Sequence, residues 1–259
     1  MNTIPGWFSG TMFVLAITAV SLAGLLIARR ATNQAYLSRH NGVASAVFSI
    51  VGTLYAVMLA FVVIVVWEGL EAAQDRASQE AAVLGDLLRD TGFLREPARS
   101  ELQKEIREYA QSIIDNEWPA MAKGESSPRV WEEVNGLFQS FSHLQPMTDR
   151  EINIHAEMLN RLNELSNHRR LRLESSSNKV PGLLWGLLVI GGIITVGFTY
   201  FLGVEDGGVH VLLTASLVVM IALTLLLIVA IDHPFGGAIR VEPDAFQTIL
   251  DHMGTPSYE

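Results

Sequence analysis

The chain has 259 residues, no cysteine and a formal net charge of −9 at pH 7. The lack of cysteine excludes disulfides, cysteine-ligated zinc and thiol catalysis, and the negative charge argues against nucleic acid as a partner. Hydrophobic residues make up 49% of the chain and charged residues only 17%, against about 25% charged in soluble domains. The apolar residues fall into four blocks, so the composition predicts a membrane protein with an aqueous insert.

The four apolar blocks, 7–28, 44–67, 181–203 and 209–231, have the length of membrane-spanning helices. Each holds about 20 apolar residues, enough to cross a hydrocarbon core of about 30 Å. The first block ends at Arg29 and Arg30 and is too long for the apolar core of a signal peptide, so we interpret it as a retained anchor. No block has an ionisable residue in its middle, which weighs against a proton pump.

The connections between the blocks define the expected domains. A first hairpin at 1–67 and a second at 181–231 flank an insert at 68–180, and a tail at 232–259 is expected to pack on the insert. The insert is predicted to be helical throughout, with Leu70, Ala77 and Leu84 recurring every seven residues in one apolar seam. Thr148 and Glu151 form a capping-box pattern at the start of a long helix, and Pro181 is expected to break that helix before the third span.

The span 44–67 is predicted to have two distinct faces. Small residues at helical spacing, which allow close helix packing in lipid, are Ser45, Ser49, Gly52 or Thr53, Ala56 and Ala60. Larger residues on another face would form a hydrophobic constriction if several copies surrounded an axis. The alternative for that face is ordinary packing and lipid contact. The candidate pore-lining residues on it are Phe48, Tyr55, Leu59, Val62 and Val66.

Two charged clusters flank the membrane. Glu68, Glu71 and Asp75 follow Trp67 and are either pore-mouth charges that concentrate cations or a solvated start of the aqueous helix. The other cluster is either an anion-attracting vestibule or an orientation signal that contacts lipid headgroups, and its residues are His168, Arg169, Arg170 and Arg172. The two clusters favour opposite ions.

The sequence contains no phosphate-binding loop, serine elbow or HExxH motif. Glu151 and His155 share a helix face, but two ligands without a third do not define a metal site. We therefore expect no enzyme activity, no metal and no cofactor.

A structured turn is expected directly after the fourth span. Pro234 and the Gly236-Gly237 pair favour a turn at the membrane surface. The candidate residues of this C-terminal turn are Asp232, Pro234, Phe235 and Gly236.

Three stretches resemble a bacterial membrane family described as bestrophin-like: "GTLYAVMLAFVVIVVWEGLEAAQDRASQEAAVLGDLLRD" (Gly52–Asp90), "VGFTYFLGVE" (Val196–Glu205) and "AIDHPFGG" (Ala230–Gly237). The resemblance implies a homopentameric anion channel with four spans, cytoplasmic ends and a large helical cytoplasmic part. It also implies that the second span lines a hydrophobic neck. In calcium-gated members an acidic run follows the turn, whereas here Gly237 to Arg240 follow it, so calcium control is not expected.

The sequence thus predicts an all-α, multi-pass protein of the inner membrane with its insert and both termini in the cytoplasm. The function expected first is a homo-oligomeric ion channel that passes anions, with lipid, inorganic ions and copies of itself as partners. The alternative is a non-conducting scaffold or sensor whose insert binds a protein, suggested by the seam and by the aromatic cluster at Trp131–Phe141. A transporter is a third class, for which Gly191, Gly192 and Gly197 are the faint hints.

Overall fold

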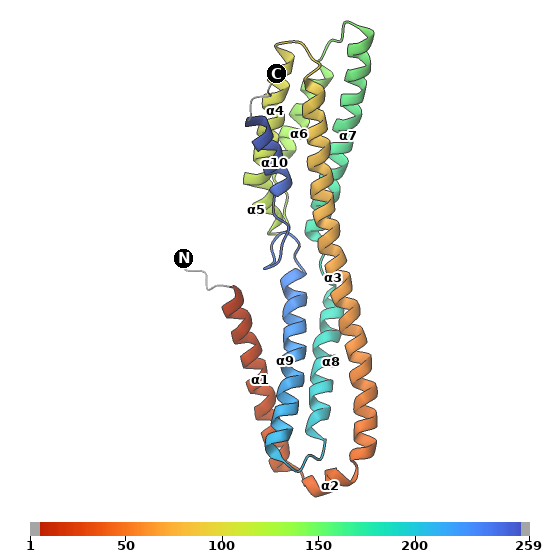
Figure 1. The fold of residues 1–259 in the computed structure, drawn as a ribbon, viewed down its shortest axis with the longest axis vertical. Helices are drawn as coiled ribbons and strands as arrows, with labels where there is room; N and C mark the ends of the chain where they lie inside the picture. The colour runs from red at the N-terminus through yellow and green to blue at the C-terminus, as the bar shows by residue number, and fades with distance from the viewer. Residues whose placement is uncertain (1–5, 255–259) are drawn as a thin grey trace. The chain divides into compact units, whose positions relative to one another are not determined.

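The fold is known from a computed structural model that describes residues 6–254. All regular elements of the described residues are helices, without a strand, as the sequence predicts (Figure 1). The long helices are α1 (Gly6–Ala31), α3 (Asn41–Thr91), α7 (Asp149–Ser177), α8 (Gly182–Tyr200) and α9 (Gly207–Ile231). The shorter elements are α2 (Gln34–Arg39), α4 (Ala98–Ser112), the π-helix η1 (Ile113–Glu117), α5 (Trp118–Met121), α6 (Pro128–Ser142) and α10 (Asp244–Gly254).

The helices form two compact units. Met1–Trp67 and Val180–Asp232 make the membrane unit, and Glu68–Lys179 and His233–Glu259 make the helical unit. Within residues 6–254, four helices are long and apolar enough to cross a membrane. They include α1, α8, α9 and the first part of α3, whereas the rest of α3 belongs to the helical unit.

In the membrane unit, α1 packs on α8 and α9, which also contact each other. The Tyr200 hydroxyl on α8 donates to the backbone carbonyl of Ser21 on α1 over 2.7 Å. At the α8–α9 turn, the Asn41 side chain both donates to and accepts from the backbone of Gly203. A Cβ at Gly203 would lie 2.2 Å from the backbone nitrogen of Ser38, so only glycine fits there.

The helical unit has its own hydrophobic core. Of the expected seam of α3, Ala77 and Leu84 are at most 2% exposed, and Leu70 is partly buried against the same core. Helix α10 packs on α4 and η1, and its Phe246 is fully buried against Trp118.

Sequence signals set two helix boundaries as expected. The capping box at Thr148 and Glu151 opens α7. The long helix breaks between Ser177 and Gly182, around Pro181, because proline lacks the backbone donor that a continuing helix needs.

Candidate functional site

The face of α3 that we predicted to line a pore is packed inside its own subunit. Tyr55, Leu59, Val62 and Val66 are each 5–8% exposed, and Phe48 is partly buried. The Tyr55 hydroxyl donates to the backbone carbonyl of Leu188 on α8 over 3.0 Å. Four of the five predicted pore-lining side chains are therefore mostly covered within their own subunit, although Phe48, Tyr55 and Leu59 border a groove of the membrane unit. We revise the face of α3 that we propose for a pore.

Two glycines of α8 make room for Tyr55. A Cβ at Gly191 would lie 2.7 Å from the ring carbon Cδ2 of Tyr55, and one at Gly192 would lie 2.9 Å from its hydroxyl. The Gly191-Gly192 pair is thus explained by the space that the Tyr55 side chain needs against α8. The hint of a broken transporter helix disappears, since α8 is continuous from Gly182 to Tyr200.

A second apolar row lies on the opposite side of α3. Its large side chains are exposed: Ile50 63%, Leu54 67%, Val57 49%, Phe61 64% and Ile64 51%. Each of Val57, Phe61 and Ile64 comes two residues after a buried residue of the first face. Two residues turn a helix by about 200°. The row thus points away from the contacts that α3 makes within the subunit.

The same row becomes acidic at its end. Glu68, Glu71 and Asp75 continue the spacing of four and three residues after Ile64, and all three are exposed. By sequence spacing along α3, the exposed apolar row of the membrane unit is thus followed by exposed acidic residues at the start of the helical unit.

The small-residue stripe borders an open groove of about 480 Å³ in the membrane unit. Ser49, Gly52, Thr53 and Ala56 line one side of it, and residues of α8 and α9 such as Thr224 line the other. Small side chains at this position leave space for another helix to approach closely.

Two of the three predicted vestibule arginines, Arg169 and Arg172, are buried. Arg172 is 0% and Arg169 5% exposed. Arg172 donates to Glu80 on α3 over 2.6 Å and to Glu117 on η1 over 2.6 Å. Arg169 binds Glu117 through both Nε and Nη2. These two residues were wrongly assigned to a vestibule, because acidic partners distant in sequence draw them into the core.

The ionic network is stabilised further by aromatic rings. Burial lowers the pKa of Arg172, but Glu80 and Glu117 outweigh this and raise the pKa above its ordinary value. Its guanidinium lies 5.3 Å from the Trp118 ring centroid and 5.7 Å from that of Phe246. The network therefore ties α3, η1, α7 and α10 together within the helical unit.

The other candidate charges remain at the surface. Arg170 is exposed and donates to the Asn167 side chain over 2.9 Å. His168 lies 3.6 Å from Glu164. No group of three metal-binding side chains occurs in the part of the chain that the structure describes.

The C-terminal turn joins several segments by specific contacts. Asp232 accepts a hydrogen bond from the backbone of Val180 over 2.7 Å, and the Pro234 carbonyl accepts one from the backbone of Val241 over 2.8 Å. Phe235 packs edge-on against Trp118, with ring centroids 5.4 Å apart. A Cβ at Gly236 would lie 2.5 Å from the carbonyl oxygen of Ala122.

A polar cluster at the α8–α9 turn was missed by sequence reasoning. Arg29 donates to the Val204 carbonyl over 2.8 Å and to Nδ1 of His210 over 2.7 Å. Because arginine only donates, Nδ1 of His210 must accept, and its Nε2–H donates to the Thr199 carbonyl over 2.8 Å. His210 near the start of the fourth span was the signal that could have revealed this cluster.

Comparison with known proteins decides the family. A family model for the bestrophin-like domain matches residues 15–246. The chain belongs to the bestrophin-like family. A solved variant of a bacterial bestrophin homologue from Klebsiella pneumoniae aligns with a TM-score of 0.74 and 15% identity, covering 98% of each chain. A second variant aligns at 0.73 and 14%, covering 93% of this chain and 97% of that one.

A structure described only as a membrane protein aligns with a TM-score of 0.66 and 16% identity, covering 96% of this chain and 98% of the other. Among curated proteins no significant match is found. At these identities the solved structures show that this bestrophin-like chain shares their fold.

Proposed function

We propose that this chain is one subunit of a homo-oligomeric ion channel, with the exposed row of α3 lining the pore. The observation that carries the proposal is the exposed apolar row of α3, from Ile50 to Ile64, which faces away from the other helices of its own subunit. If α3 helices surround an axis, this side faces the axis. Wide hydrophobic side chains there form a neck that controls water and ion passage.

The assembly is supported by the groove beside the α3 stripe. A membrane helix from a neighbouring copy gains close van der Waals contact where small residues line the surface. The bestrophin resemblance favours five copies. It also favours the placement of the helical unit in the cytoplasm.

The negative charge that follows the α3 row supports a channel that prefers cations, rather than the anion channel that the resemblance implies. Glu68 and Asp75 are exposed beyond the apolar row, whereas Arg169 and Arg172 are neutralised in the core. Acidic rings at a pore mouth concentrate cations. We therefore propose cation preference for the open channel.

The scaffold alternative loses its two motivating features. Ala77 and Leu84 of the seam are buried in the core of the helical unit, Leu70 is partly buried against it, and Val134, Leu137 and Phe141 of the aromatic cluster are buried as well. The buried side chains of both features are covered within the subunit, whereas Trp131 is exposed, so these features give the scaffold alternative less support than the sequence suggested.

Single cysteines test the proposal directly, because the chain has none of its own. The variants Leu54→Cys and Phe61→Cys place a thiol in the row, and Leu212→Cys, at a position 66% exposed on α9, is the matched control. The purified variants are recorded in planar bilayers before and after a charged, thiol-reactive reagent.

We expect the reagent to change the unitary current of the two α3 variants and to leave the α9 control unchanged. Equal effects at all three positions would reject the row as the pore lining. Intact oligomers that never pass unitary current under any ionic gradient would reject the channel itself.

A further inference from the structure

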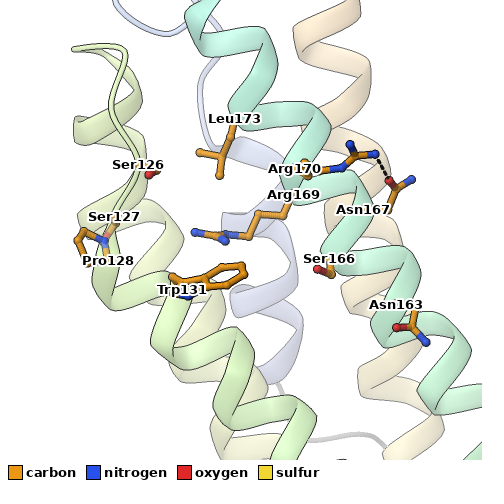
Figure 2. A pocket seen from close by; sticks show the side chains of 10 residues that line it. All are labelled: Ser126, Ser127, Pro128, Trp131, Asn163, Ser166, Asn167, Arg169, Arg170 and Leu173. Carbon is orange, nitrogen blue, oxygen red and sulfur yellow. Dashed lines mark hydrogen bonds between the residues drawn. The ribbon is translucent and has the colours of Figure 1, made fainter.

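A cavity of about 600 Å³ lies in the helical unit between the start of α6 and the second half of α7 (Figure 2). This volume falls within the range of small-molecule sites, about 300–1,000 Å³. The described residues that line the cavity include two arginines and no aspartate or glutamate. None of the lining residues belongs to α3, so the cavity is distinct from the proposed pore.

Arg169 presents an unused donor edge to this cavity. Its Nε and Nη2 bind Glu117, whereas its Nη1 makes no hydrogen bond with the described part of the chain. Figure 2 shows the Arg169 side chain extending from α7 across Trp131 toward the start of α6. A buried guanidinium that is held in place and keeps free donors is suited to an anionic acceptor.

Trp131 offers a flat apolar surface beside that donor. Its side chain is 55% exposed, and the guanidinium carbon of Arg169 lies 5.7 Å from its ring centroid. An exposed indole in a cavity packs well against a planar ring, which stacks with an offset or meets it edge-on.

The start of α6 adds positive potential to the same cavity. Ser127 caps this helix by accepting from the backbone of Val130, and helix starts attract negative charge. The Arg170 guanidinium is turned toward Asn167 (Figure 2), so it contributes charge rather than a direct contact.

The charge balance favours a monoanion. Arg169 and Arg172 are offset by Glu80 and Glu117 in the buried network, which leaves Arg170 as the uncompensated charge among the lining residues. We propose that this cavity binds a small aromatic carboxylate, with the carboxylate on Nη1 of Arg169 and the ring against Trp131. Glu117 also binds Arg172, and Arg172 binds Glu80 of α3, so the ligand contacts a network that reaches α3.

Calorimetric titration of the purified full-length chain in detergent tests this proposal, with 2-naphthoate as the probe. Two matched probes separate its parts: naphthalene-2-carboxamide has the ring without the charge, and acetate has the charge without the ring. We expect saturable binding of one naphthoate per chain, and binding at least tenfold weaker for both matched probes. Equal binding of the carboxamide, or uptake that never saturates, would overturn the proposal.

Variants locate the binding. Trp131→Ala removes an exposed side chain and is expected to weaken naphthoate binding at least tenfold. Ser126→Trp, at an exposed position on the cavity rim, is expected to block it. The control Trp67→Ala removes an exposed tryptophan of the membrane unit and is expected to bind as the wild type does. Wild-type affinity in both cavity variants would place the ligand elsewhere and refute the site.

Discussion

Arg172 on α7 donates through Nε to the carboxylate of Glu80 on α3 over 2.6 Å, and neither side chain is exposed to solvent. A buried ion pair is strongly destabilising when one partner is removed, by about 3–5 kcal/mol, because the other charge stays desolvated. Glu80 also accepts from the Tyr109 hydroxyl over 3.0 Å. The carboxylate therefore accepts hydrogen bonds from two buried side chains at once.

Glu80→Gln is expected to lower the unfolding free energy by about 3–5 kcal/mol, because it leaves an uncompensated guanidinium in the core. Thermal unfolding in detergent measures this. The control Arg89→Gln breaks a solvent-exposed pair with Asp86 and is expected to cost less than about 1 kcal/mol. A Glu80→Gln protein as stable as the control would show that the buried network contributes little.

Gly191→Ala is expected to destabilise the membrane unit, because its Cβ would overlap the Tyr55 ring. Overpacking of this kind costs about 1–3 kcal/mol. Gly197→Ala on the same helix meets no neighbouring atom within 4 Å and is expected to be neutral or stabilising, since alanine favours helix more than glycine. Unfolding in detergent compares the two variants, and Tyr55→Leu should rescue Gly191→Ala. Identical behaviour of the two glycine variants would contradict the packing argument.

Arg29→Gln is expected to loosen the α8–α9 turn, whereas Arg30→Gln, an exposed neighbour, should not. Arg29 holds the carbonyls of Val204 and Glu205 as well as His210, and a hydrogen bond to a charged group contributes about 1.5–3 kcal/mol. Hydrogen exchange of residues 204–210 measures the effect. Faster exchange in both variants, or in neither, would count against this role.

Glu151 gives stability a defined pH dependence. Hydrogen bonds from the backbone of Met147 and Thr148, with Arg95 nearby, lower the pKa of Glu151 below its ordinary value of 4.5. Its contribution is therefore fully present above pH 4.5 and is lost as the pH falls through the lowered pKa. The thermal unfolding midpoints of the wild type and of Glu151→Gln are measured from pH 7 to pH 3. We expect the difference between the two midpoints to shrink as the pH falls. A difference that stays constant across this range would exclude the linkage.

Glu68→Gln is expected to shift the reversal potential of the channel toward lower cation preference, because it removes a negative charge beside the apolar row of α3. Recording under a potassium chloride gradient measures the shift. Glu101→Gln removes an exposed charge from α4 and serves as the control. A wild-type channel that prefers anions, or equal shifts in both variants, would remove Glu68 from the ion path.

The sequence by itself determined the helices and the family. Long apolar runs specify membrane spans because backbone groups in lipid must be paired internally. Thr148 with Glu151 and Ser127 with Pro128 define helix starts because their local hydrogen bonds and fixed angles need no distant partner. The apolar seam of α3 also predicted which face of this helix is buried in the helical unit, because helical periodicity alone places those residues on one side.

Tertiary structure alone decided which face of α3 is covered in the membrane unit. The buried row that contains Tyr55 and the exposed row that contains Leu54 are both apolar. In lipid, the contrast between polar and apolar residues therefore does not mark the buried side of a helix. The fit of Tyr55 against Gly191 and Gly192 makes that choice. Tertiary structure also decided that Arg172 is buried, since its partners Glu80 and Glu117 lie 92 and 55 residues away in the sequence. Only folding brings those carboxylates close enough to draw a charged side chain out of water.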